Sequence, residues 1–289
     1  MVTLSSFKAA GHAFNLADWG GNPERTILGI HGLTGNYAHL MALAEALTPD
    51  FRLISYDVRG RGDSDPADNP SCLMNHARDA AAIIDALGLG KCLIIGHSMG
   101  GYIGAMTAGL TEKVKGVVLL DGAGRVTQQE GDMLAPALAR LDKIFPAAED
   151  YVQGVKPNYS AMGLPWNAFI DTAVRHEIGL WTKERGGDGV QYKYKGDPAR
   201  IREDLQSCID YPHAQVFAAA KCPFLLVYAS GNMGGGVPLY QENSAYDIVK
   251  SLVPDLDYFK SPSNHYTLAL ERQPELNARI RAFAARCNF

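Results

Sequence analysis

The chain has 289 residues, of which 47% are hydrophobic and 20% are charged, the balance of a soluble globular protein with a sizeable core. The formal net charge is −4 and no block of like charges occurs, so neither nucleic acid nor an anionic membrane surface is expected as a partner. No apolar run is long enough for a transmembrane helix, and the N-terminal residues lack the pattern of a signal peptide. The five cysteines are scattered, which predicts free thiols, no metal site and a cytoplasmic protein.

Short apolar runs alternate with helical patterns through the first 120 residues. The runs are rich in Ile, Val and Leu, as expected of strands that are buried on both faces of a parallel sheet. They cover residues 25–32, 52–60, 91–98 and 114–122. Helical spacing of apolar residues at 38–48 and 74–90 predicts βαβ units and an open parallel sheet.

The alternation stops after the fourth run. Residues 126–214 carry helix signals but no convincing buried strand, whereas strand character returns at 222–230 and, weakly, at 256–265. We therefore predict one sheet-based core, formed by residues 1–125 and 215–289, with a helical cap inserted at 126–214.

The third apolar run ends in the sequence GHSMG, which places Ser98 between two glycines where a strand meets a helix. This is the G-x-S-x-G pattern of a nucleophile elbow. Such a turn strains the backbone of the serine and leaves no room for Cβ atoms beside it. A plain strand-to-helix turn is the alternative, but the flanking strand and helix favour an exposed nucleophile.

A serine hydroxyl needs a base within hydrogen-bond reach. His265 follows the last predicted strand, in a loop that is able to return over the edge of the sheet, and a purely structural histidine is the alternative. His97 lies inside the elbow, and its side chain is expected to point away from the reaction. Five other histidines are expected to be surface or packing residues: His12, His39, His76, His176 and His213.

With these motifs in place, the chain resembles the α/β-hydrolase superfamily over essentially its whole length. The segment HGLTG at 31–35 resembles the His-Gly loop that supplies an oxyanion-hole N–H in that family. The segment YDVRGRGDSD at 56–65 resembles its Asp-x-Arg-Gly-x-Gly-x-Ser motif, for which we expect a structural turn held by Asp57. The elbow and the segment NHYTLALE around His265 complete the set in the family's order.

The resemblance implies an α/β-hydrolase fold, in which a mostly parallel central sheet is flanked by helices and carries an inserted helical cap. It also implies that the amides of Leu33 and Met99 form the oxyanion hole. His31 and Gly32, in the same loop as Leu33, are then expected to lie beside the substrate.

The acid of the triad departs from the common pattern of the family. Most members take it from the loop after the strand that corresponds to 222–230, but here that loop has no carboxylate and Asn232 stands near the expected place. Asp121 ends the preceding strand, a position that resembles the acid of haloalkane dehalogenases, zearalenone-type lactonases and cofactor-free quinolone dioxygenases. We favour Asp121, with Asn232, Glu242 or Asp247, or a purely structural Asp121, as the alternatives.

The predicted cap is rich in aromatic residues and cations. Trp166 and Trp181 are the candidates for substrate contact, although ordinary packing explains them equally well. The cations are able to hold a substrate carboxylate, but a solvated helix face explains them better. They are Lys156, Arg175, Lys183, Arg185, Lys193 and Lys195.

These features predict a serine hydrolase that uses Ser98, His265 and Asp121, without a cofactor or metal, to cleave a carboxylic ester or lactone through an acyl-enzyme. The expected partner is a small-molecule substrate, apolar or cyclic and of small to medium size, and a homo-oligomer is left open. The alternatives are a carbon–carbon bond hydrolase, a cofactor-free dioxygenase in which His265 acts only as a base, and a non-catalytic binding protein.

Overall fold

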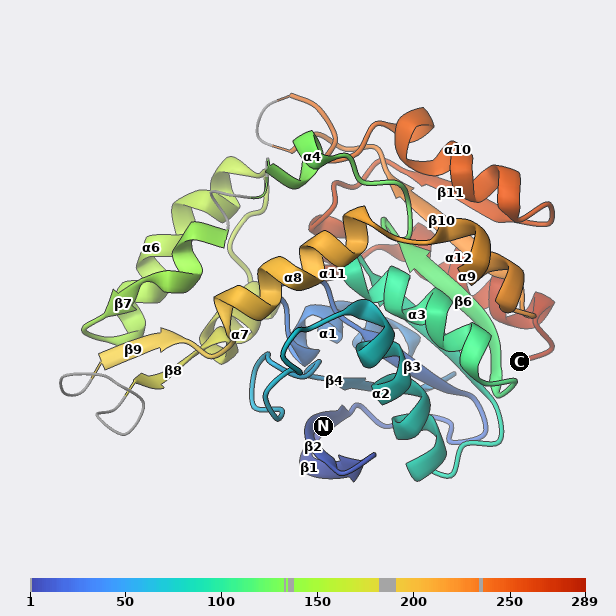
Figure 1. The fold of residues 1–289 in the computed structure, drawn as a ribbon, viewed down its shortest axis with the longest axis horizontal. Helices are drawn as coiled ribbons and strands as arrows, with labels where there is room; N and C mark the ends of the chain where they lie inside the picture. The colour runs from blue at the N-terminus through green and yellow to red at the C-terminus, as the bar shows by residue number, and fades with distance from the viewer. Residues whose placement is uncertain (1, 133, 135–137, 182–190, 234–235) are drawn as a thin grey trace.

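The computed structural model describes residues 2–132, 134, 138–181, 191–233 and 236–289. An eight-stranded sheet with the order β1-β2-β4-β3-β5-β6-β10-β11 forms its centre (Figure 1). The strands are β1 Thr3–Ala9, β2 His12–Asp18, β3 Thr26–Ile30, β4 Arg52–Tyr56, β5 Cys92–His97, β6 Val114–Leu120, β10 Phe224–Ala229 and β11 Asp257–Ser261. From β4 to β11 every neighbouring pair is parallel, so the predicted mostly parallel α/β-hydrolase sheet is confirmed.

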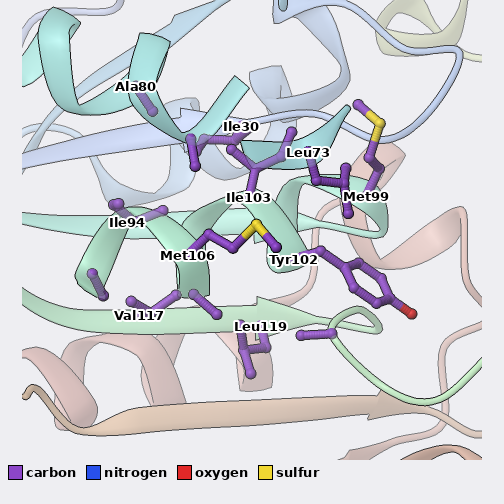
Figure 2. Packing of buried hydrophobic residues seen from close by; sticks show 14 of the residues in the cluster. Ile30, Leu73, Ala80, Ile94, Met99, Tyr102, Ile103, Met106, Val117 and Leu119 are labelled. Atoms are coloured by element: carbon purple, nitrogen blue, oxygen red, sulfur yellow. The ribbon is translucent and has the colours of Figure 1, made fainter. Parts of the chain in front are cut away.

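Helices cover both faces of this sheet, because successive side chains of each strand point to opposite faces and both sets are apolar. On β5, Ile94 belongs to an apolar cluster that includes residues of α2, α3, α9 and α10, whereas Leu93 and Ile95 belong to a second cluster with residues of α1, α11 and α12. Figure 2 shows Ile103 and Met106 of α3 among the side chains of the first cluster. The helices are α1 Met41–Leu47, α2 Leu73–Ala86, α3 Met99–Leu110, α9 His213–Ala219, α10 Glu242–Leu252, α11 Thr267–Leu270 and α12 Pro274–Arg286, with a 3-10 helix η1 at Tyr37–Leu40.

The antiparallel hairpin of β1 and β2 at the edge of the sheet was not predicted from the sequence. Most residues of β1 are exposed, so the strand lacks the continuous apolar run by which the buried strands were recognised.

The described residues of the segment 126–214 contribute no strand to the central sheet. They form the predicted helices and, in addition, a small antiparallel sheet of order β7-β9-β8 that was not predicted. Its strands are two to four residues long, too short to leave a periodic signal. The elements are α4 Gln128–Asp132, η2 Arg140–Asp142, β7 Ile144–Phe145, α6 Ala148–Ala161, α7 Ala168–Glu177, β8 Ile178–Trp181, β9 Gln191–Tyr194 and α8 Pro198–Ile209.

We call residues 126–214 the insertion; the boundaries of core and cap stay predictions. In Figure 1 the insertion extends from the sheet on one side, and α8 returns from it across the core, where α8 contacts α2 and α3. None of the helices in the described part of the chain combines the length and the hydropathy that a membrane crossing requires.

Asp57 is fully buried where the insertion meets the core. Its carboxylate accepts hydrogen bonds from the amides of Tyr37 and Asp63, at 2.9 and 3.0 Å, and lies 2.7 Å from His176 Nε2 of α7. Burial raises the pKa of Asp57, but the hydrogen bond and charge of His176 outweigh burial and hold this pKa below its ordinary value. The turn held by Asp57 therefore has the structural role that the sequence suggested, and it also anchors the insertion.

The packing of α3 on β5 predicts the effect of a core truncation. Ile94 is fully buried, so Ile94→Ala leaves a cavity and is expected to lower the free energy of unfolding by about 2–5 kcal/mol. The measurement is urea unfolding followed by circular dichroism. Leu4→Ala on β1 is the control, because Leu4 is 50% exposed and its truncation is expected to cost less than about 0.5 kcal/mol. Equal losses in the two variants would contradict this packing.

Candidate active site

Ser98 occupies the sharp turn between β5 and α3, with a φ of 54° and a ψ of −121°. This is a strained backbone conformation for a residue with a side chain. A Cβ atom on Gly96 would lie 2.1 Å from the carbonyl oxygen of Gly100, and one on Gly100 would lie 2.1 Å from that of Ile30. The strained serine and the steric need for both glycines are therefore as the motif predicts.

Asp121 directly follows β6, and His265 lies in the loop after β11. His265 Nδ1 is 2.7 Å from Asp121 Oδ2, and the two residues are 4% and 0% exposed. Since a carboxylate only accepts hydrogen bonds, Nδ1 carries a hydrogen atom and donates a hydrogen bond to Asp121. The contact expected between Asp121 and His265 is present.

The second oxygen of the Asp121 carboxylate is also held. Tyr246 Oη of α10 donates to Asp121 Oδ1 at 2.8 Å, and the backbone N–H of Ala229, at the end of β10, donates to the same oxygen at 3.1 Å. Two donors on one oxygen and the imidazole on the other fix the plane of the carboxylate. Sequence reasoning missed Tyr246, because its place in an amphipathic helix has the ordinary pattern of a core residue.

The alternative acids lie elsewhere. Glu242 forms ion pairs with Lys260 and Lys250, at 2.8 and 3.2 Å. Asp247 is exposed. The backbone carbonyl of Asn232 accepts a hydrogen bond from Asn264 Nδ2 at 3.4 Å. Asp121, rather than any of these residues, is the group placed against the imidazole.

Ser98 and His265 line the same pocket. No hydrogen bond joins their side chains among the described residues, which is common for such pairs before a ligand binds. With Nδ1 bound to Asp121, Nε2 is the ring nitrogen of His265 that remains for the serine. The other described residues of the pocket are Gly32, Leu33, Thr34, Gly35, His39, His97, Leu134, Leu138, Leu239, Tyr240 and Tyr266.

Leu33 lies in a turn that is closed by a 3.0 Å hydrogen bond from the amide of Gly35 to the carbonyl of Gly32. A Cβ atom on Gly32 would lie 3.1 Å from Ser98 Cβ, so this turn lies directly against the elbow. Met99 is the first residue of α3, where a backbone N–H has no acceptor within the helix. Leu33 and Met99 thus belong to backbone segments that adjoin Ser98, and the role of their amides as oxyanion donors stays a prediction.

His31 does not line the pocket among its described residues and is fully buried. Its Nε2 accepts a hydrogen bond from the amide of Val58 at 2.9 Å, and its Nδ1 donates to the carbonyl of Gly32 at 2.7 Å. Burial lowers the pKa of His31 to about 3, so the ring is neutral. The substrate contact expected of His31 is therefore wrong: its side chain fastens two loops of the core, whereas Gly32 does line the pocket.

Trp166 also lies away from the described pocket. Its ring packs edge-to-face on Tyr159, and its Nε1 donates to Asp171 at 3.2 Å. The structure thus favours the packing explanation for Trp166, and the aromatic residues that line the pocket, Tyr240 and Tyr266, come from the core. The side chain of Trp181 lies outside the described residues.

Three of the predicted cations of the insertion contact aromatic or acidic side chains of the protein. Lys156 lies over the ring of Trp166, Arg175 pairs with Asp171 and Glu149 at the surface, and Lys195 pairs with Asp63. Lys183 and Arg185 lie outside the described residues. Within the described ranges, no three His, Cys, Asp or Glu side chains are grouped as ligands of a metal ion.

His97 was expected to point away from the site, and this expectation was wrong. It lines the pocket, and its Nε2 donates to the backbone carbonyl of His265 at 2.8 Å. Burial, followed by the nearby charge of His265, holds the pKa of His97 well below its ordinary value, so the ring stays neutral. His97 thereby ties the elbow to the loop that carries His265.

Comparison with known proteins agrees with the fold described above. A family model described as "alpha/beta hydrolase fold" matches residues 25–158. Among solved structures, that of E-2-(acetamidomethylene)succinate hydrolase aligns with a TM-score of 0.79 at 19% identity, and the alignment covers 99% of this chain and 98% of that one. A likeness at this level of identity shows the fold.

Two curated relatives match the chain in sequence. The chain is 36% identical over 124 residues to the putative 2-succinyl-6-hydroxy-2,4-cyclohexadiene-1-carboxylate synthase of Bacillus subtilis, covering 41% of this chain and 44% of that protein. It is 29% identical over 151 residues to the 2-(acetamidomethylene)succinate hydrolase of Mesorhizobium japonicum, covering 51% and 54%. The matches thus span about half the length of these relatives.

The close approach at the elbow predicts a specific intolerance. Gly100→Ala forces β3 and α3 apart and is expected to lower the free energy of unfolding by about 3 kcal/mol or more. Gly90→Ala is the control, because a Cβ atom there has nothing within 4 Å, and a change below about 1 kcal/mol is expected. Thermal and urea unfolding measure both variants. A Gly100→Ala protein as stable as the parent would contradict the geometry of the turn.

Proposed function

We propose that this chain, which has the α/β-hydrolase fold, is a serine hydrolase that cleaves a carboxylic ester or lactone through an acyl-enzyme. The observation that carries the proposal is the contact between His265 Nδ1 and Asp121 Oδ2 at 2.7 Å, in a pocket that also contains Ser98. This arrangement supplies a nucleophile, a base and a group that orients the base.

In the first half of the reaction, Ser98 Oγ attacks the substrate carbonyl carbon while His265 Nε2 takes the hydroxyl proton. The Asp121 carboxylate stabilises the imidazolium that forms. Negative charge develops on the substrate oxygen, and in this proposal the amide of Leu33 and that of Met99, at the N-terminus of α3, stabilise it.

In the second half, the carbon–oxygen bond of the ester breaks and His265 gives its proton to the leaving alcohol, which leaves an acyl group on Ser98. A water molecule then attacks the acyl carbon as His265 takes its proton. Return of that proton to Ser98 Oγ releases the carboxylic acid and restores the enzyme. With a lactone, the alcohol and the acid are two ends of one product.

The lining of the pocket supports an apolar substrate. Leucines supply much of its described lining, together with the rings of Tyr240 and Tyr266, and no Lys, Arg, Asp or Glu is among the described lining residues. The names of the relatives refer to different substrates, a succinate derivative in one case and a cyclohexadiene carboxylate in the other. The choice of an ester or lactone therefore rests on the pocket and on the small leaving-group assistance that an ester needs.

The proposal predicts that Ser98→Ala and His265→Ala each lower kcat/KM for p-nitrophenyl esters or simple lactones by at least about 10³-fold, because the two residues act as one unit. The measurement is steady-state hydrolysis beside the unchanged protein. If His265→Ala loses activity while Ser98→Ala keeps it, and dioxygen is consumed without an added cofactor, the base-only dioxygenase replaces this proposal.

The hydrogen bonds to Asp121 predict a graded series. Asp121→Asn is expected to lower kcat by roughly 10⁴-fold, because an amide neither neutralises the imidazolium nor selects the same tautomer. Tyr246→Phe removes one donor to a charged oxygen and is expected to cost roughly tenfold. The control is Tyr102→Phe, a buried tyrosine that donates to the carbonyl of Gly124 instead. If Tyr102→Phe and Tyr246→Phe have the same effect, Tyr246 has no special part in holding the acid.

A further inference from the structure

Arg61 is a buried arginine in the loop after β4, with 1% of its surface exposed. Its Nη1 lies 2.6 Å from Oδ2 of Asp204, which belongs to helix α8 of the insertion, and both side chains are completely buried. A buried charge costs several kcal/mol unless it is paired and hydrogen-bonded. The partners of the other N–H groups of this guanidinium indicate which part of the structure the buried ion pair holds in place.

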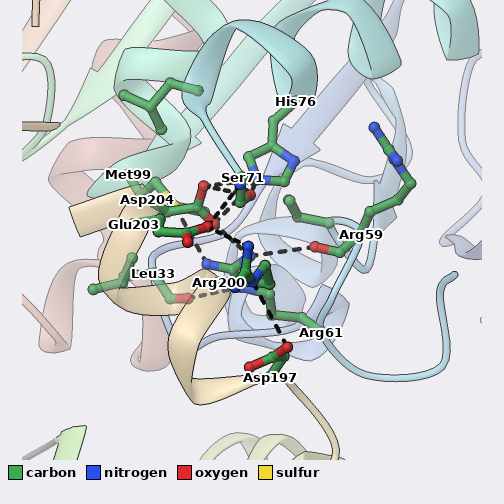
Figure 3. A network of polar contacts seen from close by, with 12 residues as sticks. Leu33, Arg59, Arg61, Ser71, His76, Met99, Asp197, Arg200, Glu203 and Asp204 are labelled. Carbon is green, nitrogen blue, oxygen red and sulfur yellow. Dashed lines mark hydrogen bonds and ion pairs between the residues drawn. The ribbon is translucent and has the colours of Figure 1, made fainter. Parts of the chain in front are cut away.

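Arg61 also contacts the two residues whose amides would form the oxyanion hole. Its Nε donates to the carbonyl of Leu33 at 3.0 Å, and its Nη2 lies 3.9 Å from Met99 Sδ. Its Nη1 also donates to the carbonyl of Arg59 at 3.2 Å. Figure 3 shows Arg61 in one polar network with Leu33 and with Asp204 of α8.

The Leu33 carbonyl belongs to the central peptide of the turn that runs from Gly32 to Gly35. The hydrogen bond from Arg61 to this oxygen restrains the backbone of Leu33 on its carbonyl side. Because the carbonyl and the amide of Leu33 are joined through one Cα atom, this restraint also limits how far the amide is able to move. The insertion holds the same turn from a second side, because Tyr194 Oη donates to the carbonyl of Thr34 at 3.1 Å.

Asp204 is itself fixed by residues of the core. Ser71 Oγ donates to its Oδ1 at 2.7 Å, and His76 Nε2 lies 3.1 Å from both carboxylate oxygens. Burial alone would raise the pKa of Asp204, but the charge of Arg61 and the hydrogen bond from His76 outweigh burial and hold this pKa below its ordinary range. The carboxylate is therefore ionised and oriented toward the guanidinium.

We propose that Arg61 is a positioning residue of the oxyanion hole, and that the insertion controls it through Asp204. Docking of α8 places Asp204, Asp204 orients the guanidinium, and the guanidinium fixes the turn that presents the Leu33 amide. This inference rests on the proposed function, since it concerns how the same site stabilises negative charge. Its importance follows from the sensitivity of catalysis to geometry, because a displacement of about 1 Å at such a site is able to cost roughly 100-fold in rate.

The test compares two conservative changes in one loop. Arg61→Lys keeps the positive charge beside Asp204, so that the carboxylate stays paired, but a single ammonium group cannot span the same set of acceptors. Arg59→Lys is the matched control: Arg59 is 3% exposed and pairs with Asp79 and Asp68, at 2.7 and 2.8 Å. We expect Arg61→Lys to lower kcat for an ester by roughly 100-fold with little change in KM, and Arg59→Lys to stay within about threefold of the parent.

A second readout separates positioning from general damage. A thionoester develops its negative charge on sulfur, which accepts hydrogen bonds weakly, so its hydrolysis depends less on the oxyanion hole than that of the matching oxygen ester. Arg61→Lys is therefore expected to slow the ester much more than the thionoester and to narrow the ratio of their kcat/KM values. Equal slowing of both substrates, or equal effects of the two lysine variants, would overturn the inference while the proposed function stands.

Asp204→Asn tests the part played by the insertion. It keeps an oxygen near Arg61 but removes the charge, and the same narrowing of the ester-to-thionoester ratio is expected, with circular dichroism confirming a folded protein. This variant also decides the question if Arg61→Lys fails to fold. An unchanged ratio in Asp204→Asn would overturn control by the insertion, and a parent protein that hydrolyses neither substrate would overturn the proposed function together with the inference.

Discussion

The candidate active site depends on one short contact, the 2.7 Å hydrogen bond between His265 and Asp121. It joins the ends of two strands that are separated by β10 in the sheet, and it is possible because parallel strands bring their carboxyl ends to one edge. The elbow is tied to the same point, since the Ser98 amide donates to the carbonyl of Leu120, directly before Asp121, at 2.9 Å. The nucleophile and the acid are thus fixed at the ends of the neighbouring strands β5 and β6, and the loop after β11 brings the base to them.

Around this contact, the core supplies the chemical groups and the insertion completes their surroundings. Leu134 and Leu138 of the insertion line the pocket. The buried carboxylates of Asp57 and Asp204 help to join the core and the insertion through their contacts with His176 and Arg61. Because such contacts contribute more to specific docking than to net stability, we infer that they set where the insertion lies, and with it the shape of the pocket.

The parts of this site that could be predicted are those with local causes. A serine between glycines at the end of a buried strand identifies the elbow, because sterics within a few residues demand that pattern. Tyr246 and His97 could not be predicted in the same way. Their contacts with Asp121 and with the His265 loop join residues 125 and 168 positions apart, and they depend on helix and strand register that no local pattern encodes. His31 was misjudged for the opposite reason. Its place in a recognised motif suggested a contact with substrate, but the side chain is buried and its hydrogen bonds hold two loops of the core together.

The central claim is that Ser98 becomes acylated during turnover. Its most direct test is to mix the protein with excess p-nitrophenyl acetate, to quench the mixture in acid within the first turnovers, and to map the peptides by mass spectrometry. An acyl-enzyme mechanism predicts a burst of p-nitrophenol equal to the enzyme concentration and an acetyl group on Ser98. If deacylation is the slower step, a larger fraction of Ser98 is acetylated in Asp121→Asn than in the unchanged protein. Steady hydrolysis without a burst and without acyl groups on Ser98 in either protein would contradict it.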